Sequence, residues 1–390
     1  MNDASLTRRR LLAALGVGTL SSALPFGALP AFGKDACKLK VVTTIFPPYD
    51  FVKTIGGDRV CATLLLKPGQ EAHTYEPTPA DIRMIQSADL FVYTGGENDT
   101  WVEGLLDSLG DKSPQSVRLI DMVATVPEEI VEGMEDDDDH DHAHGKADEH
   151  DHDHAHEHNH EHEHEHEHEH DHHHDEDKAQ KGSVAAQVAE PDHHGESNAR
   201  QEASSTESAE DDDPPADEHV WTSPKNAVAI VEALKGLLIE LDHDGAAIYN
   251  ANAAAYVKAL NALDAEYRDM VAHAKRHTIL VADRFPFRYL AEAYGLKYYA
   301  AFPGCSTQVR PSAATVAFLV DKVSAERLPV VLRVANDSPR IAQAVAEPSK
   351  AKVLELHALH NLTPQEFKAG LNYLTVMRAN LEILRKALNE

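Results

Sequence analysis

The run of histidines alternating with Asp or Glu between Asp136 and His174 is the feature that most limits what this chain can fold into. Nearly every residue of the run would carry a polar or charged group into a protein interior, so the run cannot build a hydrophobic core. It offers instead a dense row of imidazoles, the side chains that most often bind zinc, copper and nickel. Of the 26 histidines in the chain, 19 lie between His140 and His194. The sequence therefore predicts metal binding.

The histidines of this run are predicted to be weak, exchanging metal ligands. They are His140, His142, His144, His150, His152, His154, His156, His158, His160, His162, His164, His166, His168, His170, His172, His173 and His174. An acidic segment that only keeps the protein soluble is the alternative, but acidity alone would serve that purpose. The run also matches the zinc-protease pattern HExxH. We set this match aside, because a repeat produces it by chance and the apolar helix positions that it needs are absent.

The charge of the chain is concentrated in the same region. Residues 128–218 contain 34 Asp plus Glu and 4 Lys plus Arg, a net charge of −30, against −29 for the whole chain. The remainder is therefore nearly neutral, which argues against a nucleic-acid-binding surface. The acidic insert would attract cations and repel phosphates.

The first 33 residues have the features of an export signal. Three arginines from Arg8 to Arg10 precede a moderately apolar stretch that ends in small residues. The paired arginines resemble a twin-arginine signal. A transmembrane anchor is the alternative, but Pro25 and Pro30 interrupt the apolar stretch. We therefore expect residues 1–33 to direct export and the mature protein to be soluble in the periplasm.

The three cysteines suit an oxidising compartment. Cys37 and Cys61 stand at the starts of two apolar runs, Leu39–Ile45 and Ala62–Leu66. If these runs are neighbouring parallel strands, the two thiols can form a disulfide, which would stabilise the fold by about 3 kcal/mol. Cys305 would then be the unpaired cysteine. Three free thiols are the alternative.

Without the signal and the insert, about 260 residues remain, enough for two α/β domains. We expect an N-terminal lobe over residues 38–243, which contains the disordered insert 128–217, and a C-terminal lobe over residues 276–390. Residues 244–275 join them as one helix, since Ala246–Ala274 is rich in Ala and contains neither Gly nor Pro. Such a helix would be about 43 Å long.

Strand and helix signals alternate in both lobes, as in parallel-sheet proteins. The N-terminal signals are Lys40–Ile45, Phe51–Ile55, Val60–Leu66, Ala80–Gln86, Leu90–Tyr93, Val102–Leu109 and Asn226–Leu241. The C-terminal strands are Thr278–Ala282, Tyr298–Phe302, Val330–Val334 and Lys352–Leu356, and the helices are Arg288–Tyr294, Thr315–Ala325, Ile341–Ala346 and Glu366–Leu388. Two such lobes would hold a ligand in the cleft at the carboxyl ends of their strands.

A second group of histidines stands at strand ends or loop boundaries. His73 comes soon after a predicted strand, and His219 lies where the insert ends. His357 directly follows another strand, with His360 three residues later. A lone histidine in such a place is more often an ordinary hydrogen-bonded residue. Several from distant segments, beside a metal-binding run, favour a metal site.

Two motifs around these histidines are long and specific. Residues 68–81 read PGQEAHTYEPTPAD, which resembles the first-ligand loop of the solute-binding proteins of zinc and manganese ABC importers. Residues 217–226 read DEHVWTSPKN, which resembles the second-ligand motif of that family. The similarity extends from about Leu39 to Glu390, and the insert lies where zinc-specific members carry a His-rich loop.

The resemblance implies two (β/α) lobes with parallel sheets, a long rigid connecting helix and one metal ion in the cleft between the lobes. It implies Zn²⁺ as the transported ligand, no catalytic cofactor, and delivery of the ion to a membrane permease driven by an ATPase. We expect the protein to be a monomer. We also expect no enzymatic activity, because the sequence places no convincing general base beside the histidines, as a catalytic zinc site would need. A manganese or iron uptake receptor and a periplasmic metal store or chaperone are the alternatives.

The sequence departs from the family in its second half. Members usually place a His at the end of the first strand of the C-terminal lobe, whereas residues 281–290 read VADRFPFRYL here. The ligands that we predict are His73, His219 and His357, with Asp283 or His360 as the fourth. Asp283 has an alternative role, since it can pair with a neighbouring arginine. Imidazole-rich sites with at most one carboxylate favour zinc over manganese.

Overall fold

The computed structural model describes residues 37–96, 99–134, 215–305 and 310–390. The predicted export signal, residues 1–33, and the predicted weak ligands from His140 to His174 lie outside these ranges. No helix within the described ranges combines the length and the apolar character that a bilayer crossing requires. The described parts of both lobes belong to one compact unit.

The N-terminal lobe is built on a four-stranded parallel sheet of order β2-β1-β3-β4. Its strands are β1 (Leu39–Thr43), β2 (Val60–Leu64), β3 (Leu90–Tyr93) and β4 (Gln115–Arg118). Its helices are α1 (Phe46–Gly56), α2 (Pro79–Gln86) and α3 (Thr100–Leu109). The strands β1, β2 and β3 confirm three predicted strands. The sequence did not indicate β4, because its four residues, QSVR, are mostly polar.

The C-terminal lobe repeats this arrangement with the sheet order β6-β5-β7-β8, again parallel throughout. Its strands are β5 (Thr278–Arg284), β6 (Lys297–Phe302), β7 (Val330–Val334) and β8 (Lys352–Leu356). Its helices are α6 (Arg288–Tyr294), α7 (Ala313–Ala325) and α8 (Arg340–Ala346). In both lobes the first strand lies between the second and the third. The predicted fold class, two parallel-sheet α/β lobes with a helical connection, is confirmed.

Four further helices and several 3₁₀ turns complete the described chain. The helices are α4 (Pro224–Leu241), α5 (Ala246–Ala272), α9 (Pro364–Lys368) and α10 (Tyr373–Asn389). The 3₁₀ turns are η1 (Gly57–Arg59), η3 (Gly110–Lys112), η4 (Ile120–Met122), η6 (Val220–Thr222) and η7 (His243–Gly245). The prediction of one helix over 366–388 was wrong. Gly370, with φ +75°, and Asn372, which caps α10, separate α9 from α10.

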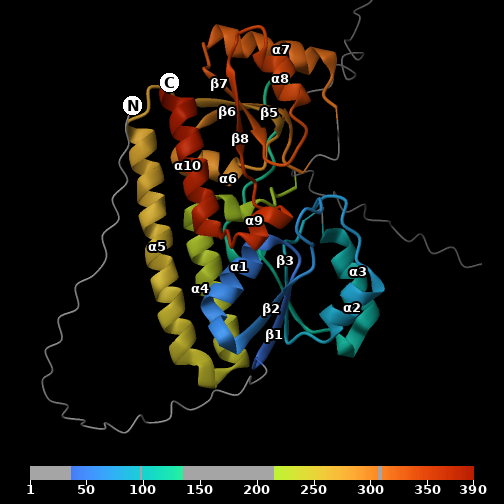
Figure 1. Ribbon diagram of the computed structural model, residues 1–390. Helices are drawn as coiled ribbons and strands as arrows, with labels where there is room; N and C mark the ends of the chain where they lie inside the picture. The colour runs from blue at the N-terminus through green and yellow to red at the C-terminus, as the bar shows by residue number, and fades with distance from the viewer. Residues whose placement is uncertain (1–36, 97–98, 135–214, 306–309) are drawn as a thin grey trace, which may run out of the picture. The chain divides into compact units, whose positions relative to one another are not determined.

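The predicted connecting helix is α5, which is 27 residues and therefore about 40 Å long. It runs alongside α4 and α10 in Figure 1 and also contacts α1. Its buried face carries Tyr249, Ala253, Tyr256, Leu260, Leu263 and Tyr267. One helix therefore supports elements from both halves of the sequence. The exact domain boundaries at residues 243 and 276 remain predictions.

A disulfide closes one edge of the N-terminal sheet. Cys37 and Cys61 are bonded, with a Cα–Cα distance of 5.5 Å. The bond is possible because β1 and β2 are parallel neighbours, with Lys40 opposite Cys61. Cys305 is free and buried. The predicted pairing is thus confirmed.

Asp50 links α1 to the two long helices. Its Oδ2 accepts hydrogen bonds from the Tyr373 backbone N–H at 3.0 Å and from the Tyr256 hydroxyl at 3.2 Å. Burial raises the pKa of Asp50, and the two hydrogen bonds oppose that effect. The carboxylate therefore satisfies two buried donors on α5 and α10.

We predict that Asp50→Ala lowers the free energy of unfolding by about 2 kcal/mol, because it leaves two buried donors without an acceptor. Urea titration followed by circular dichroism measures this change. The control is Asp58→Ala, which removes an exposed carboxylate next to the same helix. Equal stability of the two variants would contradict the role given to Asp50.

Candidate metal centre

Three histidines from three separate loops meet at one point. His73 lies in the loop between β2 and α2, His219 directly precedes η6, and His360 follows β8. One nitrogen of each ring lies within 4.8 Å of the other two. Among the described residues, this is the group of His, Cys, Asp and Glu side chains arranged to hold a metal ion.

Local sequence signals fix the loop that carries His73. Thr78 and Asp81 form a capping box at the start of α2, with Pro79 in the first turn. The helix therefore begins at a defined residue, and the loop before it has a fixed end. The loop begins at the carboxyl end of β2, which is where parallel sheets place their ligands.

His219 is positioned by the base of the insert. Residues 126–128 and 215–217 form a short antiparallel pair, with hydrogen bonds from Glu128 N–H to the Pro215 carbonyl and from Asp217 N–H to the Val126 carbonyl. The Tyr289 hydroxyl of α6 donates to the Asp217 carbonyl at 2.7 Å. The two ends of the insert thus lie side by side, two residues from His219.

Asp217 orients the His219 ring. Its Oδ1 lies 3.1 Å from His219 Nδ1 and accepts a hydrogen bond from the His219 backbone N–H at 2.8 Å. A carboxylate at Nδ1 places the proton on that nitrogen and leaves the lone pair on Nε2. The Nε2 atoms of His219 and His360 are buried and make no hydrogen bond within the described residues. Both nitrogens are therefore available to a metal ion, and His357 Nε2 shares their lack of a hydrogen bond but lies outside the three-histidine group.

The surroundings lower the pKa of His360 and raise the pKa of His219. Burial holds the pKa of His360 well below its usual range, and the neighbouring rings of His219 and His73 act in the same direction. Burial also lowers the pKa of His219, but the charge and hydrogen bond of Asp217 outweigh it, so the pKa of His219 is raised. A basic imidazole is a stronger metal ligand, but protons compete for it at a higher pH.

Aromatic rings enclose the cluster. The ring centroid of His360 lies 5.0 Å from that of His73, 4.8 Å from that of His219 and 5.2 Å from the Trp221 ring. Trp221 is itself fixed, because its Nε1–H donates to the Ala358 carbonyl at 2.8 Å. The indole therefore excludes water from one side of the site.

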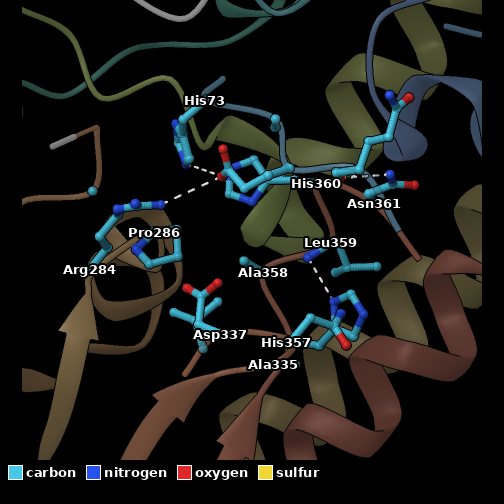
Figure 2. A pocket seen from close by; sticks show the side chains of 16 residues that line it. His73, Arg284, Pro286, Ala335, Asp337, His357, Ala358, Leu359, His360 and Asn361 are labelled. Carbon is cyan, nitrogen blue, oxygen red and sulfur yellow. Dashed lines mark hydrogen bonds and ion pairs between the residues drawn. The ribbon is translucent and has the colours of Figure 1, made fainter. Parts of the chain in front are cut away.

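His357 lies outside the three-histidine group, although it lines the same pocket as His73 and His360 (Figure 2). Its Nδ1 accepts a hydrogen bond from the Leu359 N–H at 2.9 Å, and its Nε2 lies 3.8 Å from Glu366 Oε2. Burial lowers the pKa of His357, and Glu366 opposes this. The geometry thus favours His360 over His357, the reverse of the order that we expected from the sequence.

Asp283 also lies outside the three-histidine group. Its carboxylate accepts hydrogen bonds from the backbone N–H groups of Arg284 at 2.9 Å and Val334 at 3.2 Å. Burial, together with the charge of Asp337, raises the pKa of Asp283 to about 6. The carboxylate bridges β5 and β7 through their backbones.

Glu71 is a site residue that the sequence did not reveal. Its Oε1 lies 4.0 Å from His73 Nε2 and 3.6 Å from Arg284 Nη1, so it stands between the two lobes. A pocket of about 80 Å³ opens beside these side chains and also touches Asp337. The position of Glu71, two residues before His73, did not mark it as a metal ligand in the sequence, since acidic residues are common in polar loops. Glu71 thus lies close enough to His73 to approach a metal ion that this histidine would bind.

Comparison with known proteins identifies the family of the chain. Residues 41–387 match the family described as zinc-uptake complex component A, periplasmic (ZnuA). The chain belongs to this family. Among ZnuA relatives, it is 30% identical over 354 residues to the zinc-binding lipoprotein AdcA of Streptococcus pneumoniae serotype 4, covering 90% of this chain and 56% of the relative. The chain thus spans about half the length of this relative.

Two further comparisons cover most of both chains. The high-affinity zinc uptake system protein ZnuA of Bacillus subtilis is 29% identical over 351 residues, which cover 90% of this chain and 88% of the relative. The Zn(II)-bound ZnuA-like domain of Streptococcus pneumoniae AdcA has a TM-score of 0.62 and 27% identity, and the match covers 90% of this chain and all of that one. The two-lobe fold is therefore that of the ZnuA family.

We predict that Asp217→Asn weakens zinc binding about tenfold, because it removes the charge that makes His219 basic while keeping the side-chain shape. Competition against a chelator of known affinity measures the change. The control is Asp121→Asn, which alters an exposed carboxylate paired with Arg118. Our account of Asp217 fails if both variants bind zinc like the parent chain.

Proposed function

We propose that this chain is an extracytoplasmic receptor that captures Zn²⁺ and delivers it to an ABC-type membrane importer. The observation that carries the proposal is the meeting of His73, His219 and His360, two of them with buried Nε2 atoms free of hydrogen bonds among the described residues. The proposal also rests on the membership of the chain in the ZnuA family. We assign the three histidines as ligands and Glu71 as the carboxylate that can complete the site.

The donor set favours zinc over manganese and iron. Three imidazoles with one carboxylate suit the four-coordinate tetrahedral geometry of zinc. Manganese prefers oxygen ligands, which this site supplies only at its edge. We assign the site a binding role, because the family of the chain is described as a zinc-uptake component.

The cellular setting follows from chemistry and from relatives. The disulfide between Cys37 and Cys61 suits the periplasm, because disulfides persist in oxidising compartments. The relatives carry names of zinc-binding and zinc-uptake proteins. We therefore propose an exported periplasmic monomer that hands zinc to a permease with its ATPase. The histidine-rich insert would bind further zinc weakly and raise its supply near the cleft.

The decisive test is the zinc stoichiometry and affinity of the chain with residues 137–213 replaced by a short glycine linker. The paired segments 126–128 and 215–217 remain, so the replacement leaves the base of the insert in place. We expect one tight site per chain. His219→Ala and His360→Ala should each weaken zinc affinity by more than about a hundredfold. The loss of a ligand lowers the affinity more than the loss of a residue that only hydrogen-bonds to a ligand.

The control for these variants is His273→Ala, whose ring is 78% exposed at the end of α5. The absence of a tight site in the shortened chain would place the zinc chemistry in the insert and favour a metal store. Because most sites bind zinc more tightly than manganese, relative affinity does not identify a manganese receptor, but loss of manganese uptake with unchanged zinc uptake in cells that lack the chain would do so.

We also predict that zinc affinity falls as the pH falls. Zinc binds the neutral imidazole, and the pKa of His219 lies above its ordinary value of 6.5, so protons compete for this ligand first. His360 keeps its lone pair, because its pKa is well below that value. Affinity should therefore drop about tenfold per pH unit once the pH is below the pKa of His219. Chelator competition between pH 5 and pH 8, at steps of about half a unit, measures this. A pH-independent affinity would contradict the assignment of His219.

A further inference from the structure

We infer that His357 is a positioning residue, whose ring holds the turn that aims His360 at the metal. The inference rests on the proposed function and assigns to His357 a role other than that of a ligand. It concerns the segment from His357 to His360, which we call the HALH turn. This turn directly follows β8.

The hydrogen bond between Leu359 and His357 determines which nitrogen of the ring carries the proton. The Leu359 backbone N–H can only donate, so His357 Nδ1 must accept at 2.9 Å. A neutral imidazole that accepts at Nδ1 carries its proton on Nε2. A protonated Nε2 has no lone pair for a metal. The turn hydrogen bond and zinc ligation through Nε2 are therefore mutually exclusive.

The turn needs this support because Leu359 has a left-handed backbone. Its φ is +67°, a conformation that favours glycine, yet Leu359 is a fully buried leucine of the hydrophobic core. The side chain anchors the residue, and the bond to His357 Nδ1 satisfies its N–H. The same geometry, a side chain accepting from the backbone two residues on, is common for Asn and Asp.

The rest of the HALH turn is held at every step. Asn380 of α10 accepts from the His357 N–H at 2.9 Å and donates to the His357 carbonyl at 2.8 Å. The Ala358 carbonyl accepts from Trp221, and the His360 carbonyl accepts from the Phe46 N–H at 3.0 Å. The His357 ring is the part of this network that holds the residue immediately before His360. Figure 2 shows the bond from Leu359 to His357, with His360 beside His73.

The test compares two substitutions of His357 in the full-length chain. His357→Asn keeps an acceptor, since Oδ1 of Asn takes the place of Nδ1, but it removes Nε2. His357→Leu removes both. We expect His357→Asn to bind zinc like the parent and His357→Leu to bind about tenfold more weakly. Adding Leu359→Gly to His357→Leu should restore most of the loss, because glycine adopts the left-handed conformation without strain.

Affinity is measured by competition with a strong chelator, which keeps zinc off weak sites, and His243→Leu serves as the surface control. X-ray absorption at one equivalent of zinc counts the imidazole ligands. We expect the same number for His357→Leu as for the parent and one fewer for His360→Ala. Equal losses in His357→Asn and His357→Leu, with one imidazole fewer, would make His357 a ligand and overturn the inference. Unchanged affinity in His357→Leu would overturn it as well.

Hydrogen exchange of the Leu359 amide, followed by NMR without zinc, separates this inference from the proposed function. The amide should be protected in the parent and in His357→Asn and should exchange quickly in His357→Leu. A parent chain without a tight zinc site would refute the proposed function, whereas the exchange data would still test whether His357 holds the HALH turn. Equal protection of the Leu359 amide in all three chains would refute that role of His357.

Discussion

The segment that follows β8 connects the two lobes, and the candidate metal centre depends on it. The Phe46 N–H donates to the His360 carbonyl at 3.0 Å, and the Gly69 N–H donates to the Leu362 carbonyl at 2.8 Å. Asn361 donates from its amide to the carbonyls of Lys67 and Gln70. The bonds of Gly69 and Asn361 join the loop of His360 to the loop of His73, and the bond of Phe46 joins it to the start of α1. Two of the three proposed ligands therefore keep their relative positions by hydrogen bonds of the protein alone.

A second network supports this contact from behind. Asp50 accepts from Tyr373, the Tyr373 hydroxyl donates to the Trp221 carbonyl, and the indole of Trp221 donates to the carbonyl of Ala358. A continuous path of buried groups thus runs from α1 through α10 to the HALH turn. The hydrogen bonds around His360 indicate a largely preformed site, in which a bound zinc ion would strengthen an existing contact between the lobes.

Sequence reasoning recovered the fold because its signals are local. Hydrophobic runs of strand length and a long Ala-rich helix predicted seven of the eight described strands and α5, and the motifs around His73 and His219 indicated two loops of the candidate site. The polar strand β4 and the break at Gly370 were missed, since neither carries a strong local pattern.

The site was harder to predict than the fold. The choice between His357 and His360 depends on which ring the left-handed residue Leu359 directs toward His73 and His219. No pattern of hydrophobic residues in the sequence indicates this direction. The place of Glu71 depends on Arg284, more than 200 residues away in the chain. Such details arise from tertiary contacts, which a single sequence does not display.

Because residues 126–128 pair with residues 215–217, the geometry of the candidate site does not depend on the length of the insert between these segments. Because the two ends already meet, a longer or shorter insert changes mainly the entropy of closing a loop, about 0.6 kcal/mol for each doubling of its length. His219 stays where Asp217 and Tyr289 hold it. The length and composition of the histidine-rich segment can therefore change without moving His219.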